Sequence, residues 1–141
     1  MSDVAEAGRI ILTFALVAGM IAFVGFQWNT THVFNPKWHP HARFHAVQLG
    51  LFFITLSGIA LWLLWGSAIG MRTAAWLAAA VPFVFWAGEF VALLVPGTDP
   101  SPDTENPNTF PLLGRRVHGN LFFSAWMIFF SLLGSVLVIA G

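Results

Sequence analysis

The side chains that could do chemistry in this chain lie at one depth of an otherwise apolar sequence. Glu89 is the clearest case, because no other charged side chain falls inside an apolar run. It lies six residues before the predicted end of its helix, which places it roughly 9 Å inside the membrane boundary. A carboxylate there costs about a few kcal/mol unless it is protonated or paired with a histidine or arginine. Glu89 is therefore either half of a structural clasp or, as we favour, a proton donor or acceptor toward a lipophilic substrate.

A second set of candidates lies in the run His39-Pro40-His41-Ala42-Arg43-Phe44-His45. If a helix begins near His41, then His41, His45 and Gln48 share one face of it. Two imidazoles at this spacing can share a metal ion, and Glu89 is one candidate for the third ligand. Residue 42 is alanine, which excludes the HExxH pattern of zinc peptidases.

Two further candidates flank these groups. Arg43 lies within the histidine run, and His118 opens the last apolar stretch, where it is either an interfacial histidine or the alternative third metal ligand. Arg115 and Arg116 precede it and either pair with the acidic residues of the same loop (Asp99, Asp103 and Glu105) or bind lipid phosphate.

The composition determines the environment in which these residues act. Of 141 residues, 57% are hydrophobic and 9% are charged, and the net charge is zero. A soluble domain carries about 25% charged residues, so a soluble globule is excluded. The hydrophobicity excludes a disordered chain, and the lack of a basic block argues against a nucleic-acid partner. The chain has no cysteine, which excludes disulfides, iron–sulfur clusters and thiolate nucleophiles.

Four apolar stretches are each long enough to cross the roughly 30 Å hydrocarbon core as a helix. They cover about 10–27, 44–65, 73–95 and 117–140, and none shows the alternating polarity of a barrel strand. The sequence therefore predicts an all-α, integral membrane four-helix bundle with a single domain. Both termini then lie on one side, and two longer connections lie on the other. Five prolines between residues 96 and 116 predict an extended, non-helical cap.

Cation counts give an orientation. The long loops carry four lysines and arginines, whereas the terminal side carries Arg9 and Arg72, so the loops are expected in the cytoplasm. We expect a multi-pass protein of a bacterial plasma membrane. Because four short helices enclose little volume, a homo-oligomer that completes the pocket is also expected.

The first long connection has a distinctive sequence, Asn29-Thr-Thr-His32-Val-Phe-Asn35-Pro36-Lys-Trp38-His-Pro40-His41-Ala-Arg43-Phe-His45. It resembles the signature of a family of small, largely uncharacterised four-span membrane proteins. The resemblance is strong in this loop and extends loosely over the four-helix plan.

The same plan more distantly resembles styrene oxide isomerase, a four-helix membrane enzyme. That resemblance implies haem b bound by a histidine near the start of the second helix, with the iron acting as a Lewis acid on an epoxide. His45 stands at the matching position, with His41 beside it. The asparagine and tyrosine of that family have no counterpart, because this chain offers Gln48 and Leu51 and contains no tyrosine. Only the haem ligand carries over.

Three functions follow from these observations. The first is an isomerase-like membrane enzyme acting on a small lipophilic molecule, with either metal-bound His45 or protonated Glu89 as the electrophile. The second is a haem b electron carrier ligated by His45 and His118. The third is a non-catalytic subunit or lipid-binding protein whose histidines only order the loops.

Overall fold

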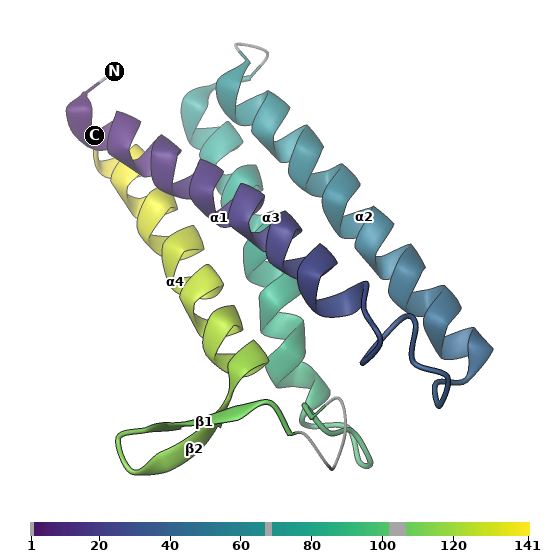
Figure 1. Cartoon of the computed structure of the whole chain (residues 1–141). Helices are drawn as coiled ribbons and strands as arrows, with labels where there is room; N and C mark the ends of the chain where they lie inside the picture. The colour runs from purple at the N-terminus through teal and green to yellow at the C-terminus, as the bar shows by residue number, and fades with distance from the viewer. Residues whose placement is uncertain (1, 67–68, 102–106) are drawn as a thin grey trace.

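The computed structural model describes residues 2–66, 69–101 and 107–141, which contain four long helices and one small hairpin. The helices are α1 (Asp3–Gln27), α2 (Pro40–Trp65), α3 (Met71–Ala92) and α4 (Gly119–Ala140). All four are long and apolar enough to cross a membrane. The two termini lie at the same end of the bundle (Figure 1), as an even number of spans requires. The protein is thus a multi-pass, all-α membrane protein, as the composition predicts.

The start of α2 is set by local capping and comes four residues before the predicted start at residue 44. Pro40 occupies the first turn, where its missing N–H costs nothing. The Nδ1 atom of His39 accepts from the backbone N–H of His41 at 3.2 Å. The helix therefore includes His41, and the expected face of His41, His45 and Gln48 is formed.

Four other boundaries also differ from the prediction. α3 begins at Met71, two residues before the predicted start. α1 already begins at Asp3, and α4 begins at Gly119 because the residues before it form a strand. α3 ends at Ala92, three residues earlier than predicted. Glu89 therefore lies in the last turn of α3, closer to the helix end than the six residues expected.

The described part of the proline-rich connection forms turns and an antiparallel hairpin rather than a simple extended strap. β1 (Thr109–Leu112) pairs with β2 (Arg115–His118), and α4 follows β2 directly. Leu113 and Gly114 have φ values of 48° and 76°, which gives the tight turn that a two-residue hairpin needs. Pro102 belongs to residues 102–106, which lie outside the described residues.

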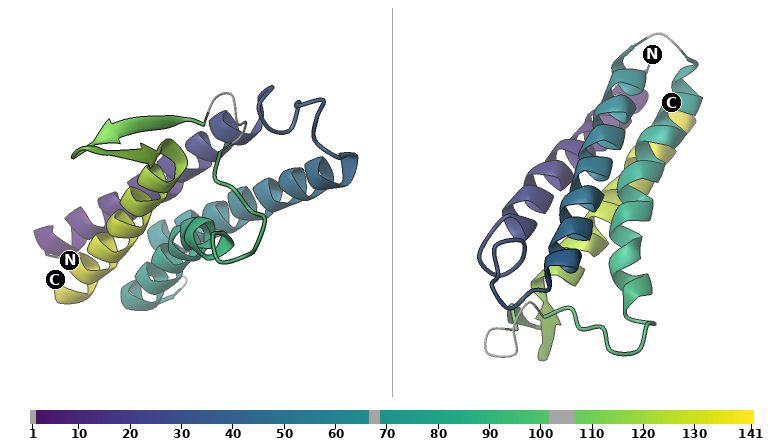
Figure 2. Two further views of the ribbon diagram at one scale, coloured as in Figure 1. Left: turned by 90° about the horizontal axis from the view of Figure 1, so that it is seen from below. Right: turned by 90° about the vertical axis from the view of Figure 1, so that its right-hand side faces the viewer.

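The two halves of the bundle have different cores. Toward the termini the core consists mainly of small and aliphatic residues, including Ala60, Ala75, Ala78 and Ala79. The half nearer the long loops has a core of Phe23, Phe53, Trp86 and Met127. Alanine lets helix axes approach closely, whereas aromatic rings hold them apart. This difference accounts for the separation of α2 from the other helices toward the loop end (Figures 1 and 2).

A close backbone contact at a glycine and one arginine hydrogen bond hold the terminal end of the bundle together. A Cβ atom on Gly8 would lie 2.6 Å from the Gly134 carbonyl oxygen, so α1 and α4 touch through their backbones. Two small residues, Ala15 of α1 and Ser131 of α4, are fully buried. Arg9 donates to the Leu64 carbonyl at 3.0 Å, which links α1 to the end of α2. These contacts hold α1, α2 and α4 together at the terminal end.

Candidate functional site

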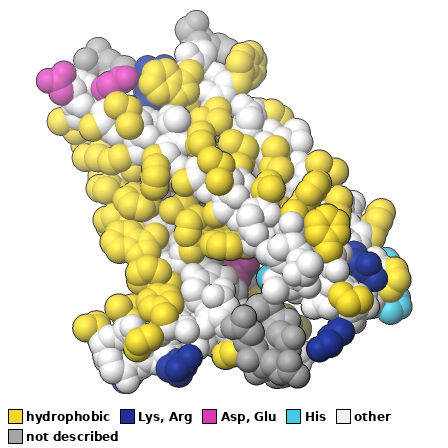
Figure 3. Space-filling view, viewed as in Figure 1, with side chains coloured by type: hydrophobic (Ala, Val, Ile, Leu, Met, Phe, Trp, Pro, Cys, Tyr) yellow, Lys and Arg dark blue, Asp and Glu magenta, His cyan; other side chains and the backbone are white. Residues whose placement is uncertain are grey.

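A large cavity opens between α2 and α3, and we call it the lateral groove. Its volume is about 1080 Å³, at the upper end of the range for small-molecule sites. Several apolar residues of its wall are strongly exposed, including Phe52 (66%) and Val84 (68%). Because these helices span the membrane, the groove opens sideways toward lipid. Figure 3 shows a recess at the loop end in which an acidic and a histidine side chain are visible.

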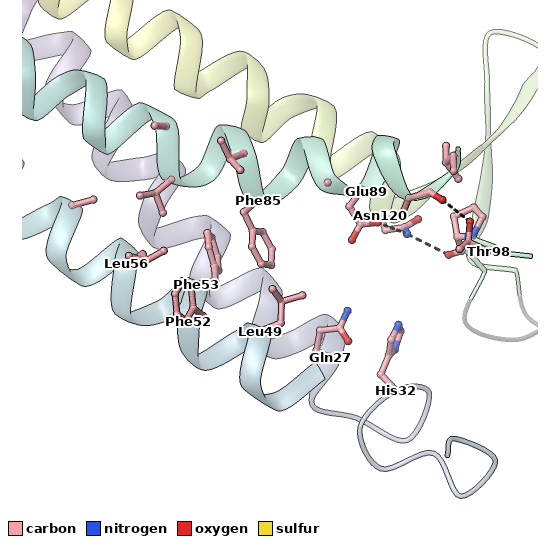
Figure 4. A pocket seen from close by; sticks show the side chains of 18 of the residues that line it. Gln27, His32, Leu49, Phe52, Phe53, Leu56, Phe85, Glu89, Thr98 and Asn120 are labelled. Atoms are coloured by element: carbon pink, nitrogen blue, oxygen red, sulfur yellow. Dashed lines mark hydrogen bonds between the residues drawn. The ribbon is translucent and has the colours of Figure 1, made fainter. Parts of the chain in front are cut away.

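The loop end of the groove is polar. The residues that form it come from α1, α3, α4 and both long connections, and they also line a second, smaller cavity of about 260 Å³. We call the shared set the polar end and the smaller cavity the inner chamber. Figure 4 shows His32 and Gln27 pointing into the space opposite Glu89 and Asn120. The polar end consists of Gln27, His32, Glu89, Pro100 and Asn120.

Glu89 is half-buried and is held by an amide rather than by a cation. Asn120 donates from Nδ2 to Oε2 of Glu89 at 3.1 Å and to the Pro100 carbonyl at 3.3 Å. Both partners are acceptors, so the orientation of the Asn120 amide is fixed. The expected histidine or arginine partner is not seen for Glu89 within residues 2–66, 69–101 and 107–141. Within the described residues, the side-chain partner of the Glu89 carboxyl is therefore a neutral amide.

The first long loop is folded so that it presents His32 to the cavity. Asn29 accepts from the backbone N–H of Thr31 at 2.8 Å and from its hydroxyl at 2.6 Å. The hydroxyl of Thr31 lies 2.8 Å from Nδ1 of His32. Since the single hydroxyl proton goes to Asn29, Thr31 accepts from Nδ1–H, and Nε2 of His32 keeps its lone pair.

The charge states of the loop groups follow from their surroundings. Burial lowers the pKa of His32 below its ordinary value, so its imidazole is neutral near pH 7. The backbone N–H of Ser101 donates to the Asp99 carboxylate at 2.7 Å, which lowers the pKa of Asp99. Asp99 also lines the groove. The site thus combines a neutral imidazole with carboxyl groups.

His41, His45 and Gln48 form a separate group, which we call the histidine cluster. The Nε2 atoms of His41 and His45 are 3.0 Å apart, and Nδ1 of His45 lies 3.2 Å from Oε1 of Gln48. All three side chains are exposed, and none lines either cavity. The predicted shared face is present, but the structure does not bring it together with Glu89.

The haem expected at His45 does not fit this arrangement. Both ring nitrogens of His45 are hydrogen-bonded, and the ring lies outside the groove that would have to hold a porphyrin. His118 also lines neither cavity, so no described space is shared by the two proposed axial ligands. Among the described residues, no three histidine or acidic side chains converge in a way that could hold a metal ion. The histidine cluster offers two ligands of a metal shell and no third.

The other two predicted site residues support the loops. Arg43 donates from Nη2 to the Trp38 carbonyl at 3.1 Å, and Trp38 lines the groove and packs on His32. His118 is half-buried at the end of β2 and directly precedes α4. Arg43 therefore positions the wall of the site rather than contributing to its chemistry.

Comparison with known proteins gives a family without a described activity. The matching family is described as a family of unknown function (DUF6640), and the match covers residues 10–113. The chain belongs to DUF6640. No curated protein and no solved structure matches the chain. The distant resemblance to styrene oxide isomerase therefore stays a prediction.

The region that matches DUF6640 includes His32 and Glu89 and ends before α4, which supplies Asn120. Sequence reasoning selected Glu89 but missed His32 and Gln27 as site residues. His32 lies in a loop, where helical spacing gives no guidance. The sequence gives one indication: Thr31, the residue before His32 in the signature, has a hydroxyl that can hydrogen-bond to the imidazole.

Proposed function

We propose that this protein is a membrane-embedded, isomerase-like enzyme that acts on a lipophilic substrate by proton transfer through Glu89. One observation carries the proposal. A carboxyl group to which no described residue supplies a cationic partner lies at the polar end of an apolar groove that opens toward lipid. Carboxyl groups in such surroundings are typical of general acid–base sites.

The proposed reaction is a shift of a double bond. In its protonated form, the Glu89 carboxyl gives its proton to one carbon of the double bond, so an O–H bond breaks and a C–H bond forms. The resulting carbocation lies against the aromatic wall. The carboxylate then removes a proton from the allylic carbon on the other side of the cation, so a C–H bond breaks, the double bond forms at its new position, and the O–H bond of Glu89 is restored. No oxidant or reductant is consumed. The amide of Asn120 orients the carboxyl group, and Nε2 of His32 accepts a hydrogen bond from the substrate's polar end.

A second candidate is a lipophile-binding protein that performs no chemistry. The size and sideways opening of the groove favour it, because both suit the entry and release of an intact molecule. This candidate needs the same groove but makes no demand on the proton of Glu89. The two candidate functions therefore predict different results when Glu89 is changed.

Product formation separates these candidates. The wild-type protein in lipid nanodiscs is incubated with a lipid extract of the cells that make it, and the lipids are compared by chromatography and mass spectrometry. The enzyme proposal expects one species to decline while an isomer of equal mass appears. Glu89→Gln should stop this conversion, since glutamine can still accept from Asn120 but cannot exchange a carboxyl proton. An extract left unchanged by the wild type contradicts the enzyme and leaves the binding protein.

We also infer that the protein resides in a bacterial plasma membrane with its long loops in the cytoplasm, on the strength of their cation excess. Leu113 at the hairpin tip is 97% exposed, and the chain has no cysteine. A Leu113→Cys variant in intact cells should therefore resist a membrane-impermeant maleimide and react after lysis. Labelling of intact cells contradicts this orientation.

A further inference from the structure

We infer that the polar end takes a protonated primary amine carried on an unbranched apolar chain. The inference rests on the proposed function, because it names the substrate class for the same groove. It follows from three separate properties of the described residues: the sign of their charge, the balance of donors and acceptors, and the shape of the apolar wall.

Apart from the imidazole of His32, the ionisable side chains that line the cavities in the described part of the chain are carboxyl groups. Glu89 lines both cavities and Asp99 lines the lateral groove, whereas no lysine or arginine lines either one within the described part of the chain. His32 adds no positive charge, because burial lowers the pKa of its imidazole. An anionic head group would meet only repulsion here, and a cation would be attracted.

Gln27 offers both donors and an acceptor, and the other hydrogen-bonding groups at the polar end are mainly acceptors. Asn120 has already committed its amide N–H groups to Glu89 and Pro100, and its buried Oδ1 has no partner. The hydroxyl oxygen of Thr98 lies 2.6 Å from the Ala92 carbonyl oxygen and 2.9 Å from the Val95 carbonyl oxygen, so its proton is donated within its own segment. Carboxylate oxygens and Nε2 of His32 are left to receive hydrogen bonds. A primary ammonium group supplies three donors and no acceptor, which matches this set.

The apolar wall is long enough to hold an extended alkyl chain. On α3 the lining runs from Leu77 to Glu89, a length of roughly 18 Å at the rise of a helix. Phe52, Phe53 and Phe85 line the part of the groove near the polar end (Figure 4). Trp38 stands at the same end, where its ring can face a cation. A narrow amphiphile can therefore lie along the groove with its head at Glu89.

The chain offers a matched pair of variants for testing the groove. Gly88 lines the groove one residue before Glu89, and a Cβ atom there would meet nothing within 4 Å. Gly58 on α2 has equally open surroundings but does not line either cavity. Gly88→Leu therefore fills the binding space, whereas Gly58→Leu adds the same side chain elsewhere.

The experiment compares dodecylamine, dodecanol and dodecanoate, which share one chain and differ in head group. Each is titrated into the detergent-solubilised full-length protein, and the apparent Kd is taken from the rise in melting temperature. We expect dodecylamine to bind about tenfold or more tightly than dodecanol, in line with about 1.5–3 kcal/mol for hydrogen bonds to charged groups. Dodecanoate should bind most weakly. Glu89→Gln should abolish the preference for the amine, Gly88→Leu should weaken all three probes, and Gly58→Leu should change none.

Each alternative occupant has its own signature. Equal binding of dodecylamine and dodecanol overturns the inference in favour of an acyl chain of the bilayer. If none of the probes binds and the protein is a dimer in detergent, the amine inference is overturned in favour of a second copy of the chain that covers the groove. Amine-selective binding without conversion in the lipid extract supports the inference and defeats the proposed enzyme. Conversion of a lipid that requires Glu89, together with no preference for the amine probe, supports the proposed enzyme and overturns the amine inference.

Discussion

The polar end and the histidine cluster lie toward the same end of the bundle, yet they differ in every property that matters for chemistry. The polar end draws side chains from three helices and two loops around two cavities. The histidine cluster comes from one helix, is exposed, and satisfies its ring nitrogens internally. In the sequence, however, the cluster has the denser set of ligating residues. Convergence of elements, rather than local density of reactive residues, distinguishes the stronger candidate site.

The largest expected effect is the loss of turnover in Glu89→Gln. Removing a general acid–base group lowers the rate by about a hundred to ten thousandfold. The effect is measured as the rate of isomer formation in nanodiscs, with His45→Asn as the variant from the other region. A similar loss in both variants would erase the distinction between the two regions.

Filling the groove comes next. Gly88→Leu should raise the apparent KM for a lipophilic substrate by about tenfold or more, because the added side chain takes up space that the substrate would occupy; tenfold corresponds to about 1.4 kcal/mol of lost binding. Gly58→Leu should leave the KM unchanged. The two KM values from one preparation check this prediction, and equal values would show that the lateral groove is not the binding site.

A smaller effect is expected at His32. His32→Asn removes the acceptor Nε2 from the polar end, and the loss of one such hydrogen bond, about 1.5 kcal/mol, corresponds to about a tenfold weaker Kd for dodecylamine. The probe titration described above measures it. An unchanged Kd would show that His32 does not accept a hydrogen bond from the bound amine.

The same residue predicts a pH dependence of stability. Burial places the pKa of His32 in the folded protein below the ordinary value of 6.5. The unfolded chain therefore binds more protons just below pH 6.5, so stability is complete above that pH and falls as the pH decreases. Melting temperatures of the wild type and His32→Asn across this range should diverge on the acid side, and parallel curves would contradict the assignment.

The smallest effect is expected in the histidine cluster. His45→Asn should change turnover by less than about twofold, because the ring contacts only His41 and Gln48 by hydrogen bonds and lies outside both cavities. Turnover and visible absorbance of the purified variant test this expectation together. A Soret band in the wild type that disappears in His45→Asn would favour the haem account instead.

The sequence predicts the fold well because an unpaired backbone N–H or C=O group is costly in lipid, so each long apolar run must form a helix. The four spans and the common side of the termini follow from that constraint. The boundaries depend on local caps, such as Pro40 and His39, and so they shifted by a few residues. The hairpin depends on positive φ at Leu113, which composition does not reveal.

For the site, the sequence predicts Glu89 because a lone carboxyl in an apolar helix has few structural explanations. The grouping around it is not predictable from spacing. His32 reaches the site through a loop held by Asn29 and Thr31, and Asn120 arrives from a helix placed by the aromatic core. Helical periodicity instead favoured His41 and His45, whose shared face points away from both cavities.

The most direct test of the account follows the proton itself. The wild-type protein in nanodiscs is incubated with the cellular lipid extract in deuterated water, and the lipids are analysed by mass spectrometry. The account predicts that one lipophilic species gains deuterium at carbon with the wild type and His45→Asn but not with Glu89→Gln. Deuterium uptake that persists in Glu89→Gln, or an extract without carbon-bound deuterium after incubation with the wild type, would contradict proton transfer through Glu89.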